Sequence, residues 1–183
     1  MNYNQGSSGL FCGCIPLDDS QVEIIEAHYS SKNQLVQTCM KNSANFSRLK
    51  YLLLEIRNWC YFTFQMKTGF RVSECLSLKI KDVWDIDKGC CKDFVCVEKC
   101  NMKGKKKRRI MKLANSAKER ITDLLAYWES MYGEPIDANS YLFRAYNRRN
   151  SDGRMNPSTI FRILKKLFSE LGFSTEHLSS HML

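Results

Sequence analysis

The sequence predicts an α+β fold that is mostly helical, with a small three-stranded antiparallel sheet inserted. The chain has 183 residues, of which 44% are hydrophobic and 26% charged, an ordinary composition for one globular domain. Long segments repeat their apolar residues at helical spacing, and three short segments alternate apolar and polar residues as strands do. We expect residues 1–16 to form a flexible N-terminal arm and residues 17–183 to form the domain.

The first half of the chain carries the patterns of two long helices and a short one. Residues 18–20 (Asp, Asp, Ser) offer capping oxygens to the first helix. After a polar break at residues 42–47, the segment Leu49–Thr68 is long and strongly apolar, which predicts a mostly buried central helix. Gly69 ends that helix. A short helix is expected over Val72–Leu78.

The middle of the chain changes to the two-residue period of strands. Alternation over Ile80–Trp84, Phe94–Glu98 and Arg108–Leu113 predicts three short strands. Turn residues at Asp85–Gly89 and at Gly104 separate them. Three strands in succession with short turns suggest an antiparallel meander.

Helical spacing returns in the second half. It predicts a helix over Ser116–Tyr132, stopped by Gly133, and another over Thr159–Leu171 with Pro157 near its first turn. A last helix is expected to begin near residues 174–176.

The chain is strongly basic. Lys and Arg number 28 against 19 Asp and Glu, which leaves a net charge of +9. Such a surplus favours polyanionic partners, nucleic acid first and an anionic membrane surface second. No apolar run approaches the roughly 18 residues that span a bilayer, and Met1–Gly9 lacks the order of a signal peptide. We therefore expect no membrane association.

The nine cysteines are odd in number and scattered through segments predicted to be helices and strands. This argues against a disulfide framework and for a reducing cytosol, so we expect a cytoplasmic protein. Cys12 and Cys14 are too close for a zinc-binding pair, and the cysteines of Cys90–Cys100 show no paired two-residue spacing. We expect no metal site and no cofactor.

One stretch holds most of the positive charge. Lys99–Lys112 contains eight basic residues and no acidic one, and we call it the basic hairpin. A turn at Lys103-Gly104 would bring its cationic groups to one place, where each neutralised phosphate adds salt-dependent affinity. A solvated loop or a nuclear targeting signal is the alternative interpretation. The residues expected to contact the DNA backbone are Lys105, Lys106, Lys107, Arg108 and Arg109.

A second informative run begins at Thr68. Arg71 follows the helix-ending Gly69 and opens the next helix, where free N–H groups favour anions. Its planar guanidinium can hold two phosphate oxygens at once. Glu74 lies one turn further and could orient Arg71 or cap the helix. Taken alone, such a pair is more often an ordinary surface ion pair.

The run Thr68–Leu78 resembles the first catalytic box of the tyrosine recombinases, the phage integrase family, which is Thr-Gly-hydrophobic-Arg-hydrophobic-Ser-Glu-x-Leu-x-Leu. The resemblance implies a catalytic role for Arg71 and a supporting one for Glu74. Lys103 falls where the family places a catalytic lysine on a β-turn, and Lys105, Lys106 or Lys107 takes that role if the register slips. His181 resembles the histidine of the second box, His-x-x-Arg.

The resemblance implies DNA strand breakage and rejoining through a 3′-phosphotyrosyl link, by an enzyme that works on double-stranded DNA as a homo-tetramer. Arg71 would stabilise charge on the phosphate, Lys103 would protonate the leaving oxygen and His181 would assist. The second arginine and the tyrosine nucleophile are expected beyond Leu183, so we expect this chain alone to bind DNA without cleaving it. The alternative is a non-enzymatic basic DNA-binding module or competitor fragment.

Overall fold

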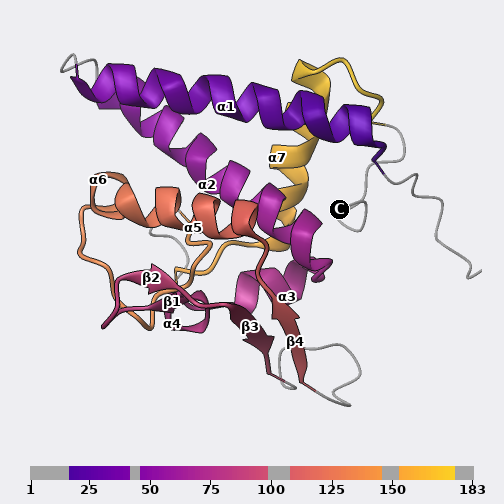
Figure 1. Cartoon of the computed structure of the whole chain (residues 1–183). Coiled ribbons are helices and arrows are strands. Elements are labelled where there is room, and N and C mark those ends of the chain that lie inside the picture. The colour runs from indigo at the N-terminus through magenta and orange to yellow at the C-terminus, as the bar shows by residue number, and fades with distance from the viewer. Residues whose placement is uncertain (1–16, 42–45, 99–107, 146–152, 176–183) are drawn as a thin grey trace, which may run out of the picture.

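The computed structural model describes residues 17–41, 46–98, 108–145 and 153–175 (Figure 1). The expected N-terminal arm, 1–16, lies outside them. Two long helices, α1 (Asp19–Lys41) and α2 (Phe46–Thr68), pack along each other near the predicted positions. An Asp18 carboxylate oxygen accepts the Gln21 N–H at 2.8 Å, so the expected capping of α1 is present.

Helix α2 is the centre of the helical body. It lies between α1 and α5 (Asn115–Ala126), and contacts both (Figure 1). From Ile56 to Gln65 every residue is buried, so the helix is enclosed on all sides over that length. This confirms the predicted buried central helix. The buried apolar side chains of the helices and of the strand segments join in one hydrophobic cluster.

The sheet differs from the predicted meander. Residues Ile80–Val83 form a helical turn, α4, and not a strand. The physical reason is local: an Asp82 carboxylate oxygen accepts the Lys79 N–H at 2.7 Å, which caps a helix, and Ile80 and Val83 are buried three residues apart. The prediction of a strand over Ile80–Trp84 is therefore wrong.

Four short strands form two antiparallel pairs where one three-stranded sheet was expected. The first pair is β1 (Trp84–Asp85) with β2 (Cys90–Cys91), and the second is β3 (Phe94–Val97) with β4 (Arg109–Lys112). In the second pair, Val97 lies opposite Arg109. The mostly helical α+β class is confirmed, although the described strands form two small sheets in place of one. Strands β3 and β4 lie below the helical body in Figure 1.

In the described second half of the chain, one predicted helix is divided in two. The expected helix over Ser116–Tyr132 is divided at Tyr127 into α5 and α6 (Trp128–Tyr132). Helix α7 (Pro157–Glu170) is capped by Asn156, whose side chain accepts the Ser158 N–H at 2.9 Å. The helix expected from residues 174–176 lies mostly outside the described residues. Among the described helices, none has the length and apolarity needed to cross a membrane.

Candidate active site

The site is built on the turn that ends α2. Gly69 has a φ of +59°, a left-handed conformation that a residue with a Cβ adopts only with strain. Its N–H donates to the Gln65 carbonyl at 2.8 Å. The Thr68 hydroxyl donates to the Phe64 carbonyl at 2.8 Å and accepts the Phe70 N–H at 3.3 Å. These bonds set the direction in which the chain enters α3 (Val72–Ser77).

Arg71 stands directly before α3 as its N-cap residue. Its side chain is 50% exposed, and one guanidinium nitrogen, Nη1, lies 3.3 Å from a Glu74 carboxylate oxygen. Half of the side chain therefore faces solvent at the start of a helix. A ligand with two oxygens could bind there, because a guanidinium presents parallel donors.

Glu74 holds the position of Arg71 from within the protein. Its side chain is 0% exposed, and its Oε2 accepts the Arg71 backbone N–H at 2.8 Å while Oε1 contacts the Arg71 guanidinium. Both suggestions for this residue, orienting Arg71 and capping the helix, describe contacts present in the structure. A fully buried carboxylate is costly unless cations and donors surround it, and here they do.

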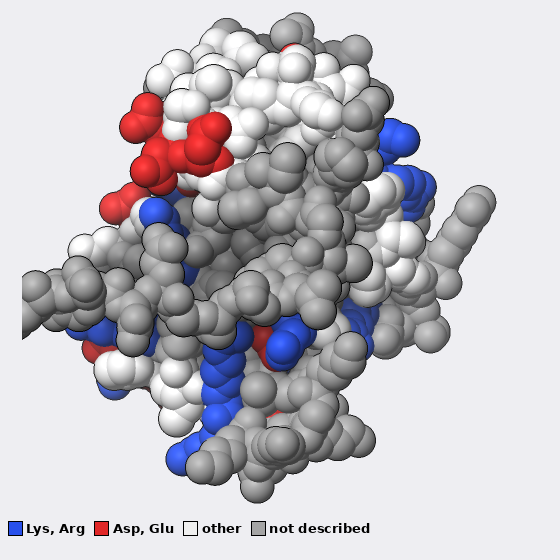
Figure 2. Space-filling model, turned by 90° about the vertical axis from the view of Figure 1, so that its right-hand side faces the viewer, with Lys and Arg blue, Asp and Glu red and all other residues white. Residues whose placement is uncertain are grey.

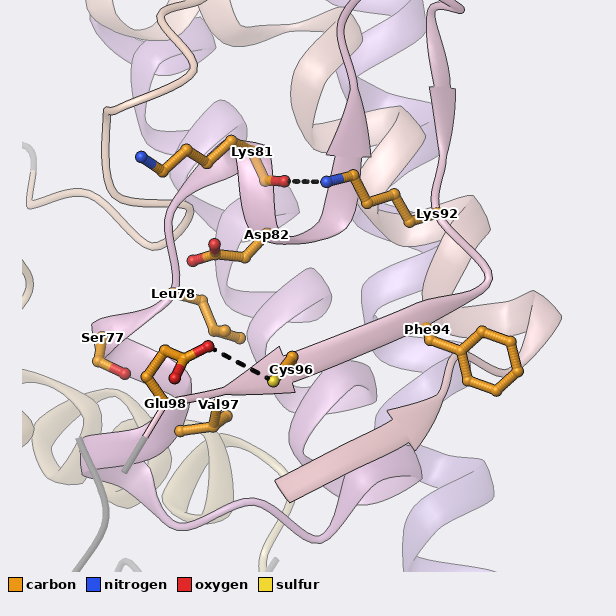
Figure 3. Close-up of a pocket in the computed structure, with 9 residues that line it drawn as sticks. All are labelled: Ser77, Leu78, Lys81, Asp82, Lys92, Phe94, Cys96, Val97 and Glu98. Carbon is orange, nitrogen blue, oxygen red and sulfur yellow. Dashed lines mark hydrogen bonds between the residues drawn. The ribbon is translucent and has the colours of Figure 1, made fainter. Parts of the chain in front are cut away.

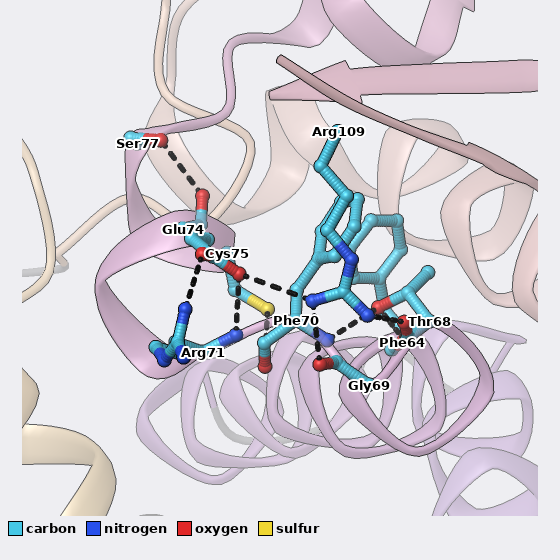
Figure 4. A network of polar contacts seen from close by, with 9 residues as sticks. All are labelled: Phe64, Thr68, Gly69, Phe70, Arg71, Glu74, Cys75, Ser77 and Arg109. Carbon is cyan, nitrogen blue, oxygen red and sulfur yellow. Dashed lines mark hydrogen bonds and ion pairs between the residues drawn. The ribbon is translucent and has the colours of Figure 1, made fainter. Parts of the chain in front are cut away.

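Arg109, on strand β4, joins the same group from another direction (Figure 4). Its Nη1 donates to the Gly69 carbonyl at 3.1 Å and lies 3.6 Å from Glu74 Oε2, and its Nη2 donates to the Thr68 carbonyl at 3.4 Å. The guanidinium carbon lies 5.0 Å from the centre of the Phe70 ring. We call Thr68, Gly69, Phe70, Arg71, Glu74 and Arg109 the arginine network.

The sequence interpretation grouped Arg109 with the phosphate-contacting residues of the basic hairpin. The structure shows its guanidinium engaged with the end of α2 and with Glu74, although 36% of the side chain remains exposed. No sequence pattern indicated these contacts, because they join residues 40 and 41 positions apart. Arg108, the preceding residue, is exposed.

A further arginine that sequence reasoning did not single out approaches α3. The Arg154 guanidinium donates to the Ser73 carbonyl at 3.2 Å, and Arg154 forms an isolated β-bridge with Arg144. The β-bridge between residues 144 and 154 sets the position of Arg154. Its only signal in the sequence is that it follows the basic residues Arg144, Arg148 and Arg149.

Cys75 lies beneath the network and is fully buried. Burial raises the pKa of its thiol, and the nearby Glu74 carboxylate raises it further. The thiol therefore stays protonated and neutral at physiological pH. It fills space beneath Arg71 and does not act as a nucleophile.

The remaining predicted site residues fall outside the described part of the chain. These residues are Lys103, Lys105, Lys106, Lys107 and His181. Strands β3 and β4 end on either side of residues 99–107. The roles of these residues stay predictions.

The surface near the site has an uneven charge distribution. Figure 2 shows the described Lys and Arg side chains spread over the lower part and right-hand edge of one face, whereas most acidic side chains gather at its upper left. Positive charge of this kind favours a polyanion over a neutral or cationic ligand. Among the residues that the structure describes, no three His, Cys, Asp or Glu side chains are grouped to hold a metal ion.

A separate pocket of about 230 Å³ lies between α4 and β3 (Figure 3). Lys92 Nζ donates to the Lys81 carbonyl at 2.5 Å across it, and Cys96 Sγ lies 3.8 Å from a Glu98 carboxylate oxygen. The Phe94 ring points away from its centre in Figure 3. This volume is below the usual range for a small-molecule site, so the arginine network is the stronger candidate.

Comparison with known proteins identifies the family of the chain. The model of the phage integrase family matches residues 29–183, which include Arg71, Glu74 and Arg109. A search of curated proteins found no match. Because the family model covers most of the chain, including the whole arginine network, the chain belongs to the phage integrase family.

Proposed function

We propose that this chain supplies the DNA-binding, phosphate-activating part of a site-specific tyrosine recombinase. The observation that carries the proposal is the placement of Arg71, half exposed at the start of α3 and held through both its backbone and its guanidinium by the buried Glu74. A guanidinium fixed in this way can bind two non-bridging oxygens of a phosphodiester with little loss of side-chain freedom.

In the proposed reaction a tyrosine hydroxyl attacks the scissile phosphorus, and its proton passes to His181 or to a water molecule. The bond from phosphorus to the 5′-oxygen breaks, leaving a 3′-phosphotyrosyl link. The 5′-oxygen takes a proton from Lys103, while Arg71 stabilises the negative charge on the phosphate and His181 assists by hydrogen bonding. Attack by a 5′-hydroxyl on the phosphotyrosyl link reverses these steps and rejoins a strand.

No tyrosine of this sequence occupies the position of the family's nucleophile. All eight tyrosines of the sequence precede His181, whereas the family's nucleophile follows the second box. Burial raises the pKa of Tyr29, Tyr61 and Tyr132, which makes them poor nucleophiles. We propose that these 183 residues alone bind DNA without cleaving it. This supports a second candidate function, a non-enzymatic DNA-binding module or competitor.

The proposal includes double-stranded DNA as partner, a homo-tetramer on DNA during recombination, and a cytoplasmic location. The tetramer comes from the family resemblance. The location is supported by five described cysteines that are free thiols, as expected in a reducing compartment.

Salt titration of DNA binding tests the role of Arg71. Because each phosphate that the protein no longer neutralises removes about 0.9 from the slope of log K against log salt, we expect Arg71→Ala to lower the slope by about that amount. Lys88→Ala removes the same charge from the turn between β1 and β2 and should leave the slope unchanged. An unchanged slope for Arg71→Ala would overturn the proposed phosphate contact.

A nicked suicide DNA substrate tests the proposal that these 183 residues bind DNA without cleaving it. After incubation with the 183-residue chain, a denaturing gel should show no covalent protein–DNA adduct, although a gel shift under native conditions shows binding. An adduct would contradict the assignment of the nucleophile outside these residues.

The basic hairpin is tested separately. Replacement of Lys105, Lys106 and Arg108 by Ala should lower the salt slope by about one for each phosphate that these side chains neutralise in the unchanged protein. The same slope as for the unchanged protein would show that these residues do not contact the DNA backbone.

A further inference from the structure

The guanidinium of Arg109, on strand β4, contacts four residues of the arginine network. Its guanidinium donates to the Gly69 and Thr68 carbonyls, lies over Phe70 and pairs with Glu74. The two carbonyls belong to the end of α2, where backbone acceptors lack helical partners and the helix dipole favours a cation. Arg109 therefore satisfies the end of α2 with the same group that neutralises Glu74.

Glu74 has contacts with two arginines on different elements. Its Oε2 lies 3.6 Å from Arg109 Nη1 and accepts the Arg71 N–H at 2.8 Å, while its Oε1 lies 3.3 Å from Arg71 Nη1. The carboxylate is 0% exposed, so water does not supply its hydrogen bonds. Without Arg109, Glu74 would be a buried anion with Arg71 as its remaining arginine partner.

From this geometry we infer that Arg109 is a positioning residue for Arg71 and acts through Glu74. With Arg109 in place, Glu74 is neutralised on one side and contacts Arg71 through one guanidinium nitrogen, so the rest of the Arg71 guanidinium remains available to an anion. Without Arg109, the carboxylate would draw the Arg71 guanidinium inward. The inference rests on the proposed function, in which Arg71 binds a DNA phosphate.

The same contacts join strand β4 to the segment Thr68–Leu78, which resembles the first catalytic box. Arg109 lies opposite Val97 in the β3–β4 pair, and its side chain reaches the turn that precedes Arg71. Arginine suits this place, because its planar group donates in several directions at once, whereas the ammonium of lysine is a compact point charge.

The experiment is a double-variant cycle read as the salt slope of DNA binding by the full chain. Arg71→Ala, Arg109→Ala and the double variant are compared with the unchanged protein. We expect each single variant to lower the slope by about 0.9, and the double variant to lower it by no more than either single variant. The effects are not additive because both changes remove the same phosphate contact.

Three results overturn the inference. A double variant whose slope falls by about twice as much would make Arg109 an independent phosphate contact. An unchanged slope for Arg109→Ala, with only a lower melting temperature, would make its role purely structural. Full recovery of the slope in Arg109→Gln, which keeps hydrogen-bond donors but carries no charge, would show that neutralisation of Glu74 does not position Arg71.

Two further variants complete the test. Glu74→Gln keeps the side-chain shape and removes the charge that would draw Arg71 inward, so Arg109→Ala/Glu74→Gln should regain the slope that Arg109→Ala loses. This combined variant also lacks the uncompensated buried anion of Arg109→Ala, so it can be measured even where that variant fails to fold. A slope as low as that of Arg109→Ala would contradict a role that acts through Glu74. Arg120→Ala removes another arginine stacked on an aromatic ring and paired with carboxylates, and should leave the slope unchanged. If Arg71→Ala itself leaves the slope unchanged, the proposed function fails. If only Arg109→Ala does so, the positioning role alone fails.

Discussion

The arginine network and the contact between α5 and α2 contain similar interactions, but these interactions have different roles. In both, a guanidinium lies over an aromatic ring: Arg109 is 5.0 Å from the centre of Phe70, and Arg120 is 3.9 Å from that of Trp59. Arg120 pairs with carboxylates of its own helix whose side chains are 65% and 33% exposed. Arg109 pairs with a fully buried carboxylate on another element, which also holds Arg71.

Glu74 also differs from Glu26, a carboxylate that joins α1 to α2. Glu26 on α1 accepts hydrogen bonds from neutral donors on α2, Trp59 Nε1 at 2.5 Å and Thr63 Oγ1 at 3.0 Å. Glu74 instead pairs with cations. Neutral donors attach one helix to another, whereas a buried anion between two arginines fixes where positive charge is presented. Contacts of the first kind stabilise the fold, whereas those of Glu74 also orient Arg71, the proposed phosphate-binding residue.

The largest effect is expected from Glu74→Ala. It leaves two arginines without their buried partner and removes the acceptor at the start of α3, so the free energy of unfolding should fall by about 3–5 kcal/mol. Urea denaturation followed by circular dichroism measures it. Glu119→Ala removes a mostly exposed carboxylate and should cost at most about 1 kcal/mol. Equal costs for the two variants would contradict the contrast between buried and exposed pairs.

Thr63→Val is expected to have the next largest effect. It keeps the shape of the side chain but removes the donor to Glu26, which should cost about 1–3 kcal/mol in urea unfolding. Thr122→Val is the matched control, because that exposed hydroxyl donates to a carbonyl of its own helix. If both variants had the same stability, the Glu26 contact would not be important for attaching α1 to α2.

Arg120→Ala should cost about 0.5–2 kcal/mol, the range of a cation–π contact. Thermal unfolding measures this loss, and salt titration of DNA binding should show no change of slope. Arg162→Ala, on the exposed face of α7, is the control for loss of charge and should stay within about 0.5 kcal/mol. A lower salt slope for Arg120→Ala would remove the functional distinction between the two regions.

The smallest effect is a pH dependence from His28, in the scaffold and away from the arginine network. Burial lowers its pKa below 6.5, and Lys32 on α1 lowers it further, while Glu170 on α7 and Glu55 on α2 oppose the shift. The neutral ring is favoured in the folded state. This contribution is therefore present above pH 6.5 and is lost as the pH falls through the folded pKa.

His28→Gln measures the contribution by difference. Between pH 7.5 and pH 5, the melting temperature of the unchanged protein should fall more than that of His28→Gln. Equal falls would show that protonation of His28 does not affect stability.

Local spacing made part of the candidate site predictable. Arg71 after a helix-ending Gly69, with Glu74 three residues later, is a pattern contained within one helical turn, and the structure places both residues as that pattern suggests. The same pattern of a carboxylate three residues along, Asp82 after Lys79, lies in a segment whose alternation predicts a strand. A four-residue helix is too short for its periodicity to be distinguished from that of a strand.

The sequence by itself determined the helical class, the buried central helix, the charge of the chain and the position of Arg71, because these depend on composition and on neighbours within a turn or two. Only the tertiary structure decided the role of Arg109. Ile110 next to it is 50% exposed, whereas Arg109 turns toward the end of α2. Which face of a strand is buried depends on its register and on what packs against it. Here the end of α2 and the buried carboxylate of Glu74 attract the Arg109 guanidinium to that face.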